Sequence, residues 1–283
     1  MSRTLVFGAS GFVGQELLLR LSGKITAISR AKIMDDSSAI KWCSGDLTKK
    51  DTVLPAHLLA GANTAYHLAA SFESKPQVTE AIVTLCEKLG VKRLIMLSQT
   101  GSKFGGMDAW HKDSYVAEGV AINSVIPEVI IVRVPILVSK KKTSPFDLYI
   151  KEFFKLPLFY PVFKAKSECA LVSVEDLSIY LEKLLKAEVS EPRNIIDLAT
   201  SKFTMKAIMS HALTQYAPKP KIGLGHFLGS WLSALIDLWG GKQGRKAMRH
   251  SIYRALAIQS DLEMIPSGIP NPRVYKSIKE MYL

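Results

Sequence analysis

The sequence predicts an α/β protein built on a doubly wound parallel sheet, with a smaller, mostly helical C-terminal subdomain. An apolar run beginning at Thr4 leads into Gly8, Gly11 and Gly14, and a leucine-rich helical pattern follows over 15–21. Segments typical of strands and helices then alternate along most of the chain, which implies parallel strands joined by right-handed crossovers. Together these observations predict a fold of the Rossmann type.

The chain has 283 residues, of which 48% are apolar, so it can fill a sizeable core and hold more than one domain. We expect a dinucleotide-binding Rossmann domain over 1–138, to which 172–200 returns. A smaller C-terminal subdomain and tail are expected over 139–171 and 201–283.

The three glycines have different tasks in a dinucleotide site. Gly8 permits the turn, Gly11 lets the backbone approach a pyrophosphate, and Gly14 lets the helix pack on the strand. The phosphates would then meet the unpaired N–H groups at the helix N-terminus. An ordinary glycine-rich turn is the alternative, but the position of this one at the first strand-to-helix junction favours nucleotide binding.

The end of the second strand indicates which nucleotide is bound. Sites that prefer NAD carry Asp or Glu there to hold the ribose 2′-hydroxyl. Here Ser29 is followed by Arg30, which can stack on adenine and meet a 2′-phosphate, so NADPH is the expected cofactor. A solvated basic turn is the alternative.

Further candidate residues follow the third, fourth and fifth strands. Asp46, in Gly-Asp-Leu 45–47, can accept from an adenine amino group or cap the next helix. His-Leu-Ala-Ala 67–70 leaves space for a flat ligand through Ala69 and Ala70, and His67 is expected in the core. Ser98, Gln99 and Thr100 would lie near a nicotinamide, because ligands bind beyond the carboxyl ends of parallel strands.

The other expected elements follow from periodicity and capping signals. Strands are expected over 25–28, 39–43, 64–68, 93–98, 129–134 and 194–198; helices are expected over 48–59, 77–89, 108–124, 144–155, 204–216 and near 276–281, with another opening at 174 behind the N-cap Ser173.

The net charge of +12 favours an acidic partner such as anionic lipid, nucleic acid or an acidic protein surface. The apolar, tryptophan-bearing stretch 223–239 and the basic stretch 242–254 resemble an interfacial membrane element; a helical core with a solvated basic face is the alternative. Basic residues without interleaved aromatic residues argue against nucleic acid. No stretch is long and apolar enough to span a bilayer. The first strand begins too close to Met1 for a signal or transit peptide, so we expect either that none exists or that it was cleaved before this numbering begins.

The three cysteines lack metal-ligand or disulfide spacing, so no metal site is expected.

The first half of the chain resembles the atypical extended branch of the short-chain dehydrogenase/reductase superfamily. The residues that carry this resemblance are Gly-Ala-Ser-Gly-Phe-Val-Gly 8–14, Arg30, 45–47, 67–70, Leu-Ser 97–98 and Val-Arg-Val-Pro 132–135.

Active members of that superfamily use Tyr-x-x-x-Lys on the helix before the sixth strand, where the ammonium lowers the pKa of the phenol for proton transfer. With Glu118 as the reference acid, the places of this pair fall on Trp110 and Ser114. Tyr115 has Gly119 four residues on, and Lys112 precedes it, so we expect no catalytic residue by the usual route.

Within this branch the sequence is similar to the family of 39-kDa accessory subunits of mitochondrial respiratory complex I. The similarity is carried by Val-Lys-Arg-Leu-Ile-Met-Leu-Ser 91–98, Ile-Pro-Glu-Val-Ile-Ile-Val-Arg 126–133 and the proline-punctuated tail 261–272. The resemblance implies a non-catalytic, NADPH-binding subunit on the matrix side of the mitochondrial inner membrane. Its implied partners are other complex I subunits and anionic or zwitterionic lipid head groups, with no nucleic acid.

The residues expected to bind NADPH are Gly8, Ser10, Gly11, Phe12, Val13, Gly14, Arg30, Asp46, Leu47, Ala69 and Ser98. A soluble NADPH-dependent reductase or epimerase, with Tyr115 as proton donor, is the alternative function.

Overall fold

The structure is a computed structural model, and it describes residues 2–30, 37–49, 52–69, 74–104, 109–140, 144, 146–147, 159–161, 168–188, 191–198, 201–204, 206–208, 210–211 and 222–224. The chain divides into two compact units. The first comprises Met1–Val134 with Val174–Leu198, and the second comprises Pro135–Ser173 with Ala199–Leu283.

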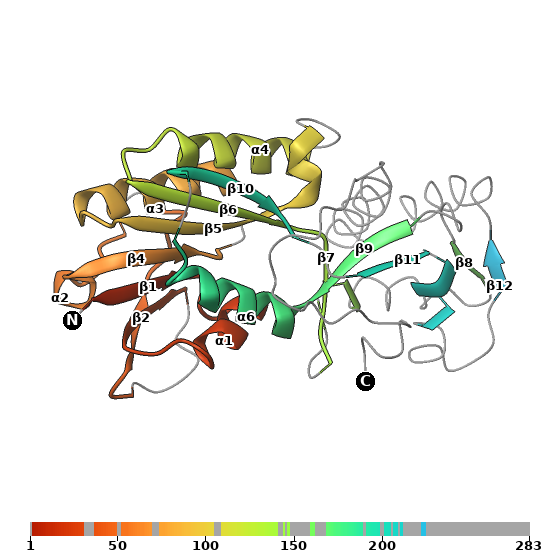
Figure 1. The fold of residues 1–283 in the computed structure, drawn as a ribbon, viewed down its shortest axis with the longest axis horizontal. Coiled ribbons are helices and arrows are strands. Elements are labelled where there is room, and N and C mark those ends of the chain that lie inside the picture. Colours follow the sequence, from red (N-terminus) through yellow and green to blue (C-terminus); the bar gives the residue numbers. More distant parts are fainter. Residues whose placement is uncertain are drawn as a thin grey trace. The chain divides into compact units, whose positions relative to one another are not determined.

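A seven-stranded parallel sheet forms the first unit, in the order β10-β6-β5-β4-β1-β2-β3 (Figure 1). Its strands are β1 (Arg3–Phe7), β2 (Lys24–Ser29), β3 (Ile40–Ser44), β4 (Ala62–His67), β5 (Arg93–Gln99), β6 (Glu128–Val134) and β10 (Arg193–Asp197). The expected doubly wound fold is confirmed.

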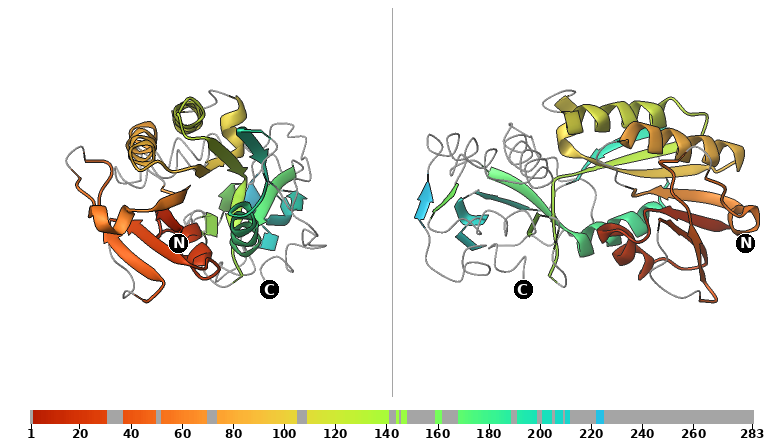
Figure 2. Two further views of the ribbon diagram at one scale, coloured as in Figure 1. Left: turned by 60° about the vertical axis from the view of Figure 1, so that its left-hand side comes forward. Right: turned by 180° about the vertical axis from the view of Figure 1, so that it is seen from behind.

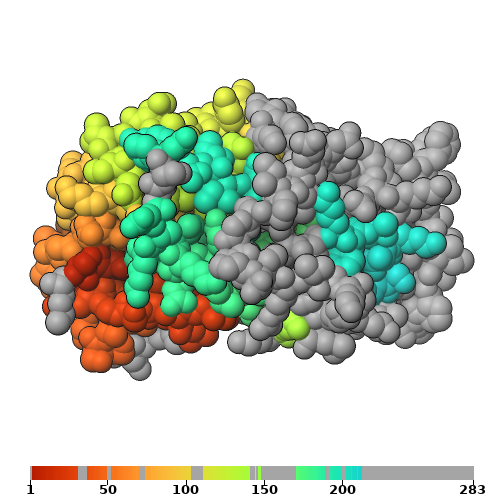
Figure 3. Space-filling model, viewed as in Figure 1, coloured from red at the N-terminus to blue at the C-terminus, as the bar shows by residue number. Residues whose placement is uncertain are grey.

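Helices cover both faces of this sheet. On one face α3 (Lys75–Lys88) packs beside α4 (Ala109–Ile122), and on the other α1 (Phe12–Leu18) packs beside α6 (Val174–Leu184) (Figures 1 and 2). Figure 3 shows α6, in green, beside the red and orange N-terminal segment on the surface of this unit. As expected, α6 carries Glu175 and Asp176 in its first turn, where their negative charges interact favourably with the positive end of the helix dipole.

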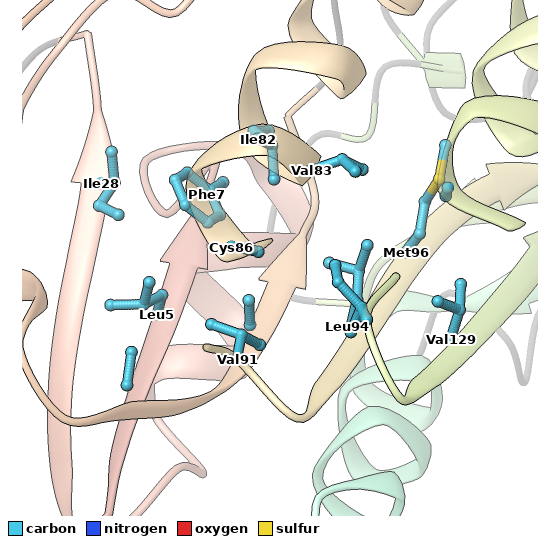
Figure 4. Close-up of a cluster of buried hydrophobic side chains, with 14 of the residues drawn as sticks. Leu5, Phe7, Ile28, Ile82, Val83, Cys86, Val91, Leu94, Met96 and Val129 are labelled. Carbon is cyan, nitrogen blue, oxygen red and sulfur yellow. The ribbon is translucent and has the colours of Figure 1, made fainter. Parts of the chain in front are cut away.

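Alternate residues of each strand face opposite sides of the sheet, and one set forms the core under α3 and α4. Ala65 and His67 point towards this side, whereas the hydroxyl of Tyr66 donates to the Leu181 carbonyl of α6 at 2.7 Å. Burial raises the pKa of Tyr66 far above its ordinary value. Figure 4 shows the buried side chains that fill this side, among them Leu5, Phe7, Ile82, Cys86, Leu94 and Met96.

The helix expected over 48–59 is wrong. Among the described residues of this stretch, only α2 (Ala56–Leu59) is helical, and it begins directly after Pro55. A proline inside a helix removes a backbone donor and clashes with the preceding turn, so a helix cannot run through this position unbroken. The residues before it form a turn at Asp46 instead of a helical turn.

The second unit contains short strands that the sequence did not indicate. The strands β7 (Ile136–Val138), β9 (Glu168–Ser173) and β11 (Ser201–Thr204) form one small sheet, and β8 (Phe159–Pro161) pairs with β12 (Ile222–Leu224). Ser144 and Asp147 exchange backbone-to-side-chain hydrogen bonds of 2.8 and 3.1 Å, a pattern typical of a helix N-terminus, where a helix was expected.

The stretches 212–216, 225–239, 242–254, 261–272 and 276–281 lie outside the described residues, as does most of 144–155. Within the described residues, no helix has the length and apolar character needed to cross a membrane.

Candidate functional site

The candidate site lies where the strand order reverses, between β1 and β4. In open α/β sheets this reversal opens a crevice beyond the carboxyl ends of the strands, where ligands bind. Here the two strand ends are close together, because Leu68 N–H donates to the Phe7 carbonyl at 2.9 Å.

Gly8 occupies the first position after β1 and has φ of +81°. A Cβ there would lie 2.7 Å from both the Ala69 nitrogen and the Leu68 carbonyl carbon, which are backbone atoms that cannot rotate away. Only glycine therefore satisfies both the left-handed backbone and the close approach of β4. The expected role of Gly8 in the turn is confirmed.

Gly14 lies in the first helical turn, against the glycine turn itself. A Cβ there would lie 2.4 Å from the Gly8 carbonyl oxygen and 2.7 Å from the Ala9 Cα, so glycine is what lets α1 pack this closely. Gly11 is exposed and is the N-cap of α1. Val13 is buried, so it can offer a ligand only its backbone; Ser10 and Phe12 are partly exposed in the same turn.

The ends of β2 and β3 bring Arg30 and Asp46 into one region. Gly45 N–H donates to the Ser29 carbonyl at 2.9 Å, and Ser44 Oγ donates to the Arg30 carbonyl at 3.2 Å. Arg30 is exposed, as a residue that meets a phosphate must be before the ligand arrives.

One carboxylate oxygen of Asp46 accepts from Thr48 Oγ1 at 2.7 Å and from Thr48 N–H at 3.1 Å. These hydrogen bonds, with the charges of Lys49 and Arg30, lower the pKa of Asp46. Asp46 therefore caps a turn, not a helix. The next residue, Leu47, packs against the core and keeps the turn close to the sheet.

His67, at the end of β4, is only 1% exposed, and its Nε2 lies 2.8 Å from Thr79 Oγ1. Burial and the charge of Lys75 lower the pKa of His67 to about 3. The expectation of a core histidine is confirmed. Ala69 is partly buried against the core, while Ala70 lies outside the described residues.

Ser98 is buried, and its hydroxyl donates to Glu118 Oε1 at 2.5 Å. Ser102 donates to the same oxygen, and Arg133 binds both carboxylate oxygens, with Nη2 to Oε2 at 2.6 Å. Burial opposes the charge of Arg133, but the hydrogen bonds and charge of Glu118 outweigh it and raise the pKa of the guanidinium. Ser98 can therefore offer a bound ligand only its lone pairs.

The buried stripe of α4 contains His111, Ser114, Ala117, Glu118 and Ala121, which recur at helical spacing. Lys112 is exposed and Tyr115 is 52% exposed, so neither belongs to this stripe. The side chain of Trp110 lies outside the described residues. Tyr115 and Lys112 therefore lie off the face of α4 that carries Ser114 and Glu118.

The structure also brings in a residue that the sequence reasoning missed. Lys75, at the start of α3, is 6% exposed, and its Nζ donates to Ser114 Oγ at 2.9 Å. Gln99 Nε2 donates to the same oxygen at 2.8 Å. No spacing rule could have found this contact, because 39 residues separate Lys75 from Ser114. Across the described residues, His, Cys, Asp and Glu side chains form no cluster suited to a metal ion.

Comparison with known proteins identifies the fold around this site. Residues 8–147 match the family described as NAD(P)H-binding. The matched segment is an NAD(P)H-binding domain. It begins at Gly8 and includes every residue expected to contact the nucleotide.

Two named dehydrogenases align with part of this chain. Over 118 residues the chain is 29% identical to the human sterol-4-alpha-carboxylate 3-dehydrogenase, decarboxylating, and 27% identical to the Bos taurus protein of that name over the same length. The alignments cover 38% of this chain and 31% and 33% of those proteins, so the chain matches about a third of their length.

Solved structures show the same fold at lower identity. A nucleoside-diphosphate-sugar epimerase from Staphylococcus aureus superposes with a TM-score of 0.68 at 14% identity, over 93% of this chain and 92% of that chain. The Bordetella bronchiseptica enzyme WbmG in complex with NAD and UDP gives a TM-score of 0.59 at 14% identity, over 79% and 82% of the two chains. These likenesses concern the fold.

Proposed function

We propose that this protein is a non-catalytic, NADPH-holding accessory subunit of respiratory complex I, peripheral to the matrix side of the mitochondrial inner membrane. The observation that carries the non-catalytic part is the buried stripe of α4. Ser114 and Glu118 lie on it, and Ser114 has the position that the resemblance gives to the catalytic lysine. The glycine turn keeps the geometry that holds a nucleotide, so binding is retained without the usual proton relay.

The assignment to complex I rests on sequence resemblance. Two of the three stretches that carry it form β5 and β6, which any protein of this fold requires, so the tail 261–272 is the more specific signal. Other complex I subunits are the proposed partners. The apolar stretch 223–239 and the basic stretch 242–254 are the proposed contact with lipid head groups.

In this role the nucleotide stabilises the folded subunit. A ligand that binds only the folded state adds RT ln(1 + [L]/Kd), about 2.7 kcal/mol at a hundredfold excess over Kd. Purification from the native membrane tests the assembly: the protein should comigrate with complex I and release NADPH on denaturation. Its recovery as a free soluble monomer would reject the proposal.

The choice of NADPH over NADH rests on Arg30. We expect Arg30→Glu to weaken NADPH binding about tenfold while NADH binding changes little, because a charge-assisted contact to the 2′-phosphate is lost. Lys24→Glu is the matched control, because Lys24 is an exposed cation at the opposite end of the same strand. If both variants lost the same NADPH affinity, Arg30 would act only through the net charge of the protein and not through a contact with the 2′-phosphate.

A soluble NADPH-dependent reductase or epimerase is the second candidate, favoured by the dehydrogenase and epimerase names of the relatives. A screen for NADPH oxidation with carbonyl substrates separates the two. Turnover that is lost in Tyr115→Phe would replace the non-catalytic proposal.

A further inference from the structure

The strand β10 is the outermost strand of the seven-stranded sheet, and its outer edge has no partner strand among the described residues (Figure 1). Its sequence, Arg-Asn-Ile-Ile-Asp 193–197, pairs with β6 in one continuous parallel register without a bulge. An open strand edge presents a row of backbone donors and acceptors to any chain that can pair with it. The outer edge of β10 is therefore regular and open to a further strand.

The hydrogen bonds at the two ends of β10 show which residues face this open edge. The Pro192 carbonyl accepts from Val129 N–H at 2.9 Å, and Leu198 N–H donates to the Arg133 carbonyl at 2.8 Å. Successive residues of a strand direct their backbone groups to opposite neighbours, so the even-numbered residues between these two also bond to β6. The N–H and carbonyl groups of the odd-numbered residues within 193–197 therefore point outwards.

The centre of this edge is apolar. Edge strands are commonly protected from pairing by a lysine, a proline or a bulge, whereas the central residue of β10 is Ile195, which is 42% exposed. The opposite edge strand, β3, contains Lys41, and none of its five residues is an exposed large apolar side chain. The two edges of the sheet therefore differ, and β10 is the one that offers an apolar centre to a second strand.

The charged residues at the two ends of β10 have opposite signs. The guanidinium of Arg193 donates to four carbonyl oxygens at 2.7 to 3.0 Å, among them that of Ile122 at the end of α4. Carbonyl groups are neutral, so they leave the positive charge in place. Asp197 lies 3.9 Å from Arg133, which also binds Glu118, so two carboxylates lie beside one guanidinium. On one face of the sheet β10 therefore begins with positive charge and ends with negative charge.

The sequence of β10 is complementary to itself about Ile195. When two copies of the strand pair antiparallel with Ile195 opposite Ile195, Arg193 of each copy lies opposite Asp197 of the other. The same arrangement joins the outward N–H and carbonyl groups of the odd-numbered residues, so backbone and side chains favour the same register. Shifting one copy by two residues places a charged side chain opposite Ile195 and loses these ion pairs.

We propose that the outer edge of β10 is a self-association surface, through which two copies of this chain form an antiparallel strand pair that joins their sheets. The same patch is used on both copies, so the contact closes at a dimer. A contact made by one short strand lies at the small end of protein interfaces, so we expect a reversible dimer with Kd on the order of 10 µM. The inference does not depend on the nucleotide or on the proposed assembly with complex I.

Sedimentation velocity of the full chain across about 1–100 µM, a range around that Kd, tests the proposal. The wild type should shift from monomer to dimer. Ile195→Lys should weaken dimerisation at least about tenfold, because it places two ammonium groups opposite each other at the centre of the edge. Val53→Lys is the matched control, because Val53 is an exposed apolar residue that follows β3, the opposite edge strand, and this variant should dimerise like the wild type.

Charge exchange between the ends of β10 tests the register. Arg193→Glu and Asp197→Lys should each dimerise poorly alone, because like charges then lie opposite each other in the pair. An equimolar mixture of the two variants should form a heterodimer with a Kd near that of the wild type, because the new carboxylate of one variant lies opposite the new ammonium of the other. A mixture that pairs no better than each variant alone would overturn the inference.

A wild type that stays monomeric at about 100 µM would overturn the inference and leave the proposed function intact. Dimerisation that Ile195→Lys and Val53→Lys preserve equally would also overturn it, because another surface would then form the contact. Should the charge variants not fold, hydrogen exchange of the wild type replaces them. The N–H groups of 193–197 should gain protection as the protein concentration rises, whereas those of 40–44 should not. Equal changes in the two segments would contradict pairing at β10.

Discussion

The glycine turn after β1 and the buried face of α4 lie in the same unit, but different requirements fix their sequences. At the turn, a Cβ on Gly8 would lie 2.7 Å from the nearest backbone atom, and a Cβ on Gly14 would lie 2.4 Å from its own nearest backbone atom, so neither position can hold a larger residue. On α4 the contacts are made by side chains, namely Ser114 and Glu118, and side chains can be exchanged or supplied from another helix.

The difference indicates how a nucleotide-binding fold can exchange polar side chains on α4 and remain folded. The turn has no substitute for glycine, because any Cβ must push the backbone of β4 or α1 away. The polar groups on α4 can be satisfied in several ways, and here Arg133, Ser98 and Ser102 bind Glu118 while Lys75 binds Ser114. Variants that separate folding stability from nucleotide binding test this contrast.

The largest loss of stability is expected for Glu118→Ala. Removing the carboxylate leaves Arg133 buried without its bidentate partner, which lowers the free energy of unfolding by about 3–5 kcal/mol. Urea denaturation followed by circular dichroism measures it. Glu188→Ala is the control, because Glu188 is exposed, and we expect a change within about 0.5 kcal/mol. Similar losses for the two variants would contradict the structural role of the buried pair.

Gly8→Ala should affect both stability and binding. The left-handed backbone costs a Cβ-bearing residue about 1–2 kcal/mol, and the contact with β4 adds about 1–3 kcal/mol of overpacking. Gly23→Ala measures the backbone contribution alone, because Gly23 has φ of +89° but no atom within 4 Å of the place where its Cβ would lie; the difference between the two variants gives the contribution of the contact. NADPH binding should be lost only in Gly8→Ala. Equal destabilisation by the two variants would show that the approach of β4 is not tight.

The sequence predicted the first unit well because its signals are local. The glycine spacing and the strand-helix alternation depend on neighbouring residues, and Gly8, Gly14, His67 and the start of α6 lie where they were expected. The helix predicted over 48–59 does not form because Pro55, also a local signal, interrupts it.

What could not be predicted depends on contacts between distant segments. Lys75 meets Ser114 across 39 residues, and Glu118 meets Arg133 across 15 residues and two elements. The strands β7 and β11 have only three and four residues, which is too short for a reliable period of two. The binding roles of Arg30, Asp46 and Ser98 stay predictions.

The pH dependence of stability should report the burial of His67. Its pKa is lowered to about 3 in the folded protein, from an ordinary value near 6.5. Between these values the unfolded chain binds the extra proton, so stability is present above about pH 6.5 and falls as the pH decreases towards 3. We expect the wild type to lose about 2 kcal/mol more than His67→Gln between pH 7 and pH 5. Parallel pH profiles of the two proteins would show that His67 is solvated.

The smallest effect is expected for Tyr115→Phe. Tyr115 is 52% exposed on α4, one residue beyond the buried Ser114, so losing its hydroxyl should change the free energy of unfolding by less than about 0.5 kcal/mol. NADPH affinity should also be unchanged. The neighbouring variant Ser114→Ala should lower the free energy of unfolding by about 1–3 kcal/mol, because it removes a buried hydroxyl that accepts from Lys75 and Gln99. Removing two neighbouring hydroxyls of one helix would then have different effects, because Tyr115 lies on the exposed face and Ser114 on the buried face. If Tyr115→Phe instead abolished a measured NADPH oxidation, the exposed face of α4 would be the catalytic one, and the contrast between a fixed glycine turn and an exchangeable helix face would fail.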